Sequence, residues 1–140
     1  MFFKKIKIDS LESMTLGITG MRSKEEYEAL PTEAGVELSY YVYYYSNVDD
    51  PRVLQGRTVV DMEEFIALLN ECNVPKWDGF SGKHPKGVHD GYMFNFKAVV
   101  NGDEKIRADG SENFPNGYHE LVRKLRDLIR ENNICEDGEK

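Results

Sequence analysis

The stretch VELSYYVYYYSN (36–47) constrains the fold more than any other, because it is rich in tyrosine and valine. Aromatic and β-branched residues favour strands, in which successive side chains point to opposite faces of a sheet. The residues that follow it, from Asn47 to Pro51, are typical of a turn, and RVLQGRTVV (52–60) then predicts a returning strand. These two segments therefore predict an antiparallel hairpin.

Four further segments alternate between apolar and polar residues and predict strands: 2–8, 13–20, 92–100 and 104–109. The last two are joined through Asn101-Gly102, a dipeptide typical of two-residue hairpin turns. The segment 22–35 is polar and contains Pro31 and Gly35, so we expect a loop with a helical turn there. The sequence thus predicts about six strands.

Two segments show the apolar spacing of a helix. Asp61 and Glu64 form a capping box before an apolar run that ends near Pro75. The second helix has one apolar stripe, made of Tyr118, Leu121, Val122, Leu125, Leu128 and Ile129. Both helices bury their apolar sides if they pack on the same face of a sheet. We therefore expect a single α+β domain over 1–140, with a mostly antiparallel sheet of about six strands, two helices packed on one face and a mobile tail from about residue 134.

The charge balance of the chain limits its partners. Its 140 residues include 18 Lys plus Arg against 25 Asp plus Glu, for a net charge of −7. Nucleic-acid backbones are bound by clustered cations, so we expect no nucleic-acid partner. No apolar run is long enough to span a membrane, and the start MFFKKIKIDS lacks the apolar segment of a secretory signal. We expect a soluble cytoplasmic protein, with a leader removed during processing left open.

The two cysteines, Cys72 and Cys135, form no disulfide framework and are expected to be reduced thiols. Cys72 lies near the C-terminal end of the first predicted helix, where the helix dipole disfavours a thiolate nucleophile. The chain contains no P-loop, no G-x-G-x-x-G and no G-x-S-x-G motif. We therefore expect a non-catalytic protein without a cofactor.

The stretch WDGFSGKHPKGVHDGYMF (77–94) holds the only tryptophan of the chain, two of its histidines and four glycines. Imidazole, thiolate and carboxylate groups bind zinc, and the candidates here are Cys72, His84, His89 and Asp90. His84 and His89 are five residues apart in a loop, which is not the spacing of two ligands on one helix face. A small metal-dependent hydrolase that uses His84, His89 and Asp90 is the alternative to a binding function.

A structural role for this stretch is the interpretation that we favour. Trp77 and Phe80 are expected to anchor the loop in the core, while the glycines supply turn conformations. In that case no metal is bound, and the loop only connects the first helix to the next strand.

The tyrosines of 36–47 are the best indication of function. Tyr40 and Tyr44 share a strand face with Leu38 and Val42, and Tyr41, Tyr43 and Tyr45 share the other. If the helices cover the first face, these three tyrosines form an exposed patch on the second. Cross-strand packing alone accounts for them in one interpretation. In the other, the patch is a contact surface for another protein or for a second copy in a homodimer.

Three elements of the second half carry a resemblance: WDGF (77–80), DGYMFNF (90–96) and GSENFP (110–115). Over about residues 70–132 the chain resembles an uncharacterised type of small α+β domain from gut Firmicutes. The resemblance implies a bacterial origin and a structural role for the Trp-Asp-Gly-Phe element. It implies no activity, so no catalytic residue is carried over.

Overall fold

The computed structural model of the chain describes residues 7–44, 51–88 and 91–132. Its elements in chain order are β1 (Leu11–Thr19), β2 (Lys24–Thr32), β3 (Gly35–Tyr43), β4 (Arg52–Val60), α1 (Met62–Glu71), the 3₁₀ turn η1 (Val74–Lys76), β5 (Ser81–Gly82), β6 (Met93–Val100), β7 (Glu104–Ser111) and α2 (Tyr118–Asn132). The strands form one seven-stranded sheet in the order β4-β3-β2-β1-β6-β7-β5. Every pairing is antiparallel except that of β5 with β7, so the α+β class and the mostly antiparallel sheet are confirmed.

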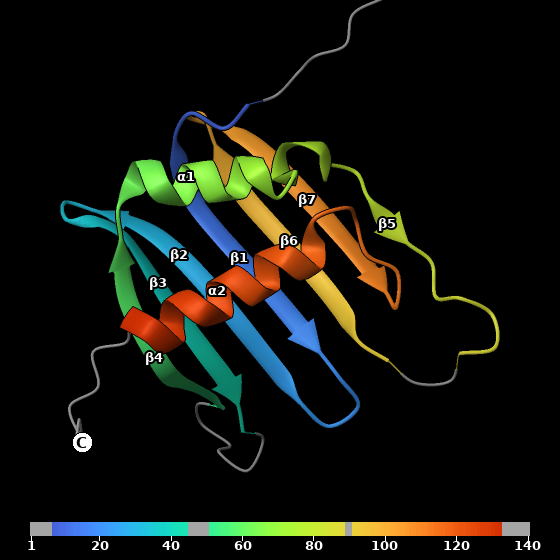
Figure 1. Cartoon of the computed structure of the whole chain (residues 1–140). Coiled ribbons are helices and arrows are strands. Elements are labelled where there is room, and N and C mark those ends of the chain that lie inside the picture. The colour runs from blue at the N-terminus through green and yellow to red at the C-terminus, as the bar shows by residue number, and fades with distance from the viewer. Residues whose placement is uncertain (1–6, 45–50, 89–90, 133–140) are drawn as a thin grey trace, which may run out of the picture.

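Both helices pack on the same face of the sheet, as expected (Figure 1). The core lies between them and the sheet, and it contains Leu16, Leu38, Phe96, Leu121 and Leu125, all without exposed surface. Among the elements that the structure describes, none covers the opposite face of the sheet (Figure 1). We call that face the open face.

The predicted start of α1 is confirmed by its cap. The Asp61 side chain accepts a hydrogen bond from the backbone N–H of Glu64, at 3.1 Å. This bond satisfies one of the N–H groups that the first turn of a helix leaves free. Phe65 and Leu69 of α1 are then buried against the sheet.

The expected number of six strands was wrong, and the largest error is at 22–35. This segment is not a loop with a helical turn, because β2 occupies most of it and pairs with both β1 and β3. Tyr27 and Ala29 point into the core between exposed or half-buried neighbours, which is the alternation of a strand. Pro31 is tolerated because it lies beyond Ala29, the last β2 residue that pairs with β1. The two-residue strand β5 is the second strand that the sequence did not predict.

The predicted strand at 2–8 lies mainly outside the described residues. Lys7 and Ile8 are described and belong to no strand. Ile8 is buried and is fixed by the Asn70 side chain, which accepts from the Ile8 N–H and donates to the Ile8 carbonyl, both at 3.0 Å. The predicted mobile tail from about residue 134 also lies outside the described residues. Within the described part of the chain, no helix has the length and apolarity needed to cross a membrane.

Candidate functional site: the open face of the sheet

The structure places the predicted tyrosines on the faces that strand alternation assigns to them. Tyr41 and Tyr43 lie on the open face, whereas Tyr40 packs against the core next to Tyr27, with ring centroids 4.8 Å apart. A bulge in the β3–β4 pairing follows Tyr40, where β4 passes from Gly56 to Leu54 between consecutive β3 partners. Tyr45 lies outside the described residues.

Two arginines cover Tyr41, so this residue does not belong to the exposed tyrosine patch that we expected. Tyr41 is only 8% exposed although no helix covers it. The Arg52 guanidinium carbon lies 3.8 Å from the centre of the Tyr41 ring, and Arg57 Nη2 donates to the Tyr41 hydroxyl at 3.3 Å. Guanidinium groups stack favourably on aromatic rings. Tyr41 is therefore covered by guanidinium groups and is not part of an exposed aromatic patch.

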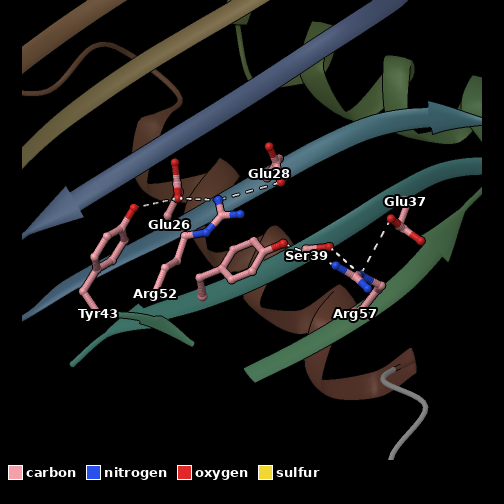
Figure 2. A network of polar contacts seen from close by, with 8 residues as sticks. Glu26, Glu28, Glu37, Ser39, Tyr43, Arg52 and Arg57 are labelled. Carbon is pink, nitrogen blue, oxygen red and sulfur yellow. Dashed lines mark hydrogen bonds and ion pairs between the residues drawn. The ribbon is translucent and has the colours of Figure 1, made fainter. Parts of the chain in front are cut away.

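Glu26 is the centre of a polar network on the open face (Figure 2). Its Oε1 accepts a hydrogen bond from the Tyr43 hydroxyl at 3.1 Å and one from Arg52 Nη1 at 3.2 Å. Arg52 also lies 3.9 Å from Glu28, and Lys24 Nζ lies 4.6 Å from the centre of the Tyr43 ring. Tyr43 and the basic groups around it are thus held in fixed positions by β2 and β4.

Arg57 extends this network along β3 and β4. Its Nε donates to Ser39 Oγ at 2.8 Å and lies 3.7 Å from Glu37 (Figure 2). Ser39 is buried although it points away from the helices. The network therefore covers β3 with side chains from its two neighbouring strands.

A hollow of about 590 Å³ adjoins the network where β1 and β6 cross the open face. Most of its lining side chains are small or polar, among them Thr15, Gly17, Lys24, Asn95, Lys97 and Asp109, and the larger apolar ones are Met93 and Phe94. Gly17 and the threonines leave room because their side chains are short. The open face is therefore recessed where β1 and β6 lie side by side.

Basic side chains outnumber acidic ones on the open-face positions of the described strands. The basic ones are Lys24, Arg52, Arg57, Lys97, Lys105 and Arg107, and the acidic ones are Glu26, Glu28, Glu37 and Asp109. This local excess is opposite in sign to the net charge of −7 of the whole chain. Among the described residues, Lys97, Lys105 and Arg107 form no side-chain ion pair.

The histidine loop gives the hydrolase alternative no assembled site among the described residues. His84 is exposed, its Nδ1 lies 2.7 Å from Ser111 Oγ, and its Nε2 is hydrogen-bonded with the Val88 carbonyl oxygen. His89 and Asp90 lie outside the described residues. In the described ranges, no three His, Cys, Asp or Glu side chains are grouped so that they could hold a metal ion.

Trp77 is an anchor, as its sequence context predicts. It is 1% exposed, and its Nε1 donates to the backbone carbonyl of Asn116 at 2.9 Å. Phe80 is half-buried and packs against the same core. The Trp-Asp-Gly-Phe element therefore joins the end of α1 to the turn before α2.

Cys72 is buried at the C-terminal cap of α1. Burial, together with the nearby charge of Glu120, raises the pKa of its thiol to about 11. A protonated, buried thiol is a poor nucleophile at neutral pH. This agrees with the expectation that Cys72 has no catalytic role.

A second polar cluster, which the sequence did not reveal, lies between the sheet and α2. The Tyr40 hydroxyl donates to Glu25 Oε1 at 2.9 Å, and Tyr27 is 2% exposed beside it. Burial raises the pKa of Tyr27 to about 12, helped by the charge of Glu25 and opposed by Arg126. Glu25 and Tyr27 belong to the segment expected to be a loop, so their shared strand face was not predicted. The alternation of residues 25–29 is the signal that could have found them.

Stability is expected to fall at alkaline pH because buried groups hold their protons more tightly than in the unfolded chain. The pKa rises from 9.0 to about 11 for Cys72 and from 10.0 to about 12 for Tyr27. The stabilisation is complete below about pH 9 and is lost as the pH rises through these folded-state values. Urea unfolding at successive pH values tests this, and Tyr27→Phe should flatten the decline above pH 10. The exposed Tyr44→Phe is the control, and an equal effect of both variants would contradict the assignment.

Comparison with known proteins identifies no family for this chain. None of the models of known protein families matches the chain, and no curated protein is significantly similar to it. The resemblance of residues 70–132 to a domain of gut Firmicutes stays a prediction.

Proposed function

We propose that the protein is a non-catalytic binding domain whose open face engages an acidic surface of another protein. The observation that carries this proposal is the excess of basic side chains on the open face of a chain whose net charge is −7. Lys97 and Arg107 are opposite each other on β6 and β7, and neither has an ion-pair partner among the described residues. Carboxylates of a partner would supply the missing charge.

The network around Glu26 favours binding because it is already ordered. Arg52 and Tyr43 are held by hydrogen bonds to Glu26 before any partner arrives. Side chains that are fixed in advance lose less conformational entropy on association. Tyrosine and arginine are also the residues that contribute most often to binding hot spots.

A different protein fits this face better than a second copy does. Two-fold pairing of two open faces brings the same excess of basic groups together, and like charges repel. Three of the carboxylates that could offset them in the second copy, Glu26, Glu28 and Glu37, already lie within 4.0 Å of Arg52 or Arg57. The fourth, Asp109, accepts a hydrogen bond from the Ser81 hydroxyl. The predicted homodimer is therefore the competing outcome of the test.

The test uses a charge reversal that leaves the core intact. Lys97→Glu/Arg107→Glu changes two exposed side chains, and Arg123→Glu on the exposed side of α2 is the matched control. Proteins captured from native extract by the wild type are purified, and their Kd for each variant is measured at low and high salt. We expect the double variant to bind at least about tenfold more weakly and the control to bind like wild type, with an affinity that falls as salt rises.

The contribution of Tyr43 to binding is tested by a separate variant. Tyr43→Ala is expected to weaken the same complex more than His84→Ala does, because Tyr43 belongs to the network and His84 to the adjoining loop. Equal Kd values for the wild type and the charge reversal would refute the acidic partner. A dimeric mass by light scattering that becomes monomeric in Tyr43→Ala would instead support the homodimer.

A further inference from the structure

A second hollow lies on the helix side of the sheet, opposite the open face. It has a volume of about 460 Å³ and is lined by Tyr27, Tyr40, Gln55, Arg126, Ile129 and Arg130. Volumes of this order hold small organic molecules. Its lining residues come from β2, β3, β4 and α2, so the tertiary structure alone brings them together.

Two arginines dominate this hollow. Arg126 and Arg130 are four residues apart on α2, so their side chains lie on one side of the helix, and both line the hollow. Neither forms an ion pair with a carboxylate of the described residues. Guanidinium groups offer several donors and no acceptor, which suits them to carboxylate and phosphate oxygens.

The Tyr27 hydroxyl is a buried donor without an acceptor. Tyr27 is 2% exposed, and no described residue accepts a hydrogen bond from its hydroxyl. Arg126, whose charge acts on this hydroxyl, has only donors and cannot serve as its acceptor. Buried polar groups are paired with protein groups or ordered water in nearly all proteins, so this hydroxyl, in the wall of a hollow, has a free donor for water or for a ligand.

The remaining lining residues do not neutralise these donors. Tyr40 already donates to Glu25, and Glu25 lies outside the lining of this hollow. Gln55 is at the bulge of β4, has no partner in the β3–β4 register and is exposed, and its amide donates only one long hydrogen bond, to the Val53 carbonyl at 3.5 Å. Ile129 and the Tyr40 ring supply an apolar wall.

We propose that this hollow binds a small organic anion, with its oxyanion group held between Arg126, Arg130 and the Tyr27 hydroxyl. The volume exceeds that of the oxyanion alone, so the organic part rests against Ile129 and the Tyr40 ring. Phosphate and carboxylate groups share this chemistry. The site is independent of the protein-binding face, because the two lie on opposite sides of the sheet.

Calorimetric and thermal titrations test the site on the whole protein, with inorganic phosphate and citrate as the two probes and potassium chloride at equal ionic strength as the blank. We expect one probe to raise Tm by about 3–5 °C at ten times its Kd. The probe that binds more tightly distinguishes a phosphate site from a carboxylate site.

Substitutions of the lining residues test whether the probe binds in this hollow. Arg126→Gln and Arg130→Gln should each weaken the binding of that probe at least about tenfold, and Tyr27→Phe should weaken it while keeping the ring. Arg123→Gln is the control, because it removes the same charge from α2 outside the hollow. Circular dichroism identifies any variant that does not fold. If one of the two arginine variants is unfolded, the affinity of the other for the probe tests the proposal. Equal shifts in Arg123→Gln and Arg126→Gln, or no shift with either probe, would overturn the proposal.

Discussion

Replacing Gly117 by alanine is expected to lower the free energy of unfolding by about 2–5 kcal/mol. Gly117 has a φ of +91°, and a Cβ atom there would lie 1.9 Å from the backbone carbonyl oxygen of Cys72. The left-handed backbone costs a residue with a side chain about 1–2 kcal/mol. Relief of the clash requires a shift between the end of α1 and the start of α2, which costs about 1–3 kcal/mol more.

Gly102→Ala separates these two costs. Gly102 has a similar φ of +95°, but a Cβ there would have no atom within 4 Å. Its substitution should therefore cost only about 1–2 kcal/mol. Urea unfolding of both variants measures the difference. Equal losses would show that the contact with Cys72 adjusts freely.

Trp77→Ala is expected to cost about 3–5 kcal/mol, the usual range for removing a buried large aromatic side chain. Its ring meets Phe96 edge-on at 5.0 Å, and its indole N–H holds the carbonyl of Asn116, the residue before Gly117. The substitution therefore leaves a cavity and loosens the same junction between the helices. Trp77 emission in the wild type should be blue-shifted and should move to the red on unfolding.

Trp77→Phe is the matched control for the cavity. It keeps an aromatic ring but leaves the Asn116 carbonyl without its donor, at a cost of about 1–3 kcal/mol. Chemical denaturation followed by circular dichroism compares the two variants, since neither retains the fluorophore. A loss in Trp77→Phe as large as that in Trp77→Ala would assign the stability to the hydrogen bond. Native emission typical of water would contradict the burial.

Most of the fold could be predicted because its signals are local. The capping box at Asp61, the hairpin turn at Asn101-Gly102 and the apolar stripe of α2 each depend on residues a few positions apart. The turn spans three residues and not the two that the dipeptide predicts, because Val100 pairs with Glu104. Strand β2 was missed because Pro31 and its charged residues are also typical of a loop. Its strand conformation depends on β1 and β3, which pair with it from both sides.

The candidate site was predictable only in part, for the same reason. Alternation assigns Tyr41 and Tyr43 to one face whatever their neighbours are. What covers them is not local, because Arg52 reaches Tyr41 and Glu26 from β4, and a bulge sets the register. An exposed aromatic patch was therefore the natural expectation, and a network of paired arginines and glutamates is what the strands assemble.

The sequence by itself determined the α+β class, the positions of both helices and the faces of Tyr40, Tyr41 and Tyr43, because periodicity and capping act within one segment. Only the tertiary structure decided the charge of the open face and the grouping of Tyr27 with Arg126 and Arg130. Both features arise from side chains that are distant in the chain and meet through strand register and helix packing. Periodicity within a single segment carries no information about such contacts.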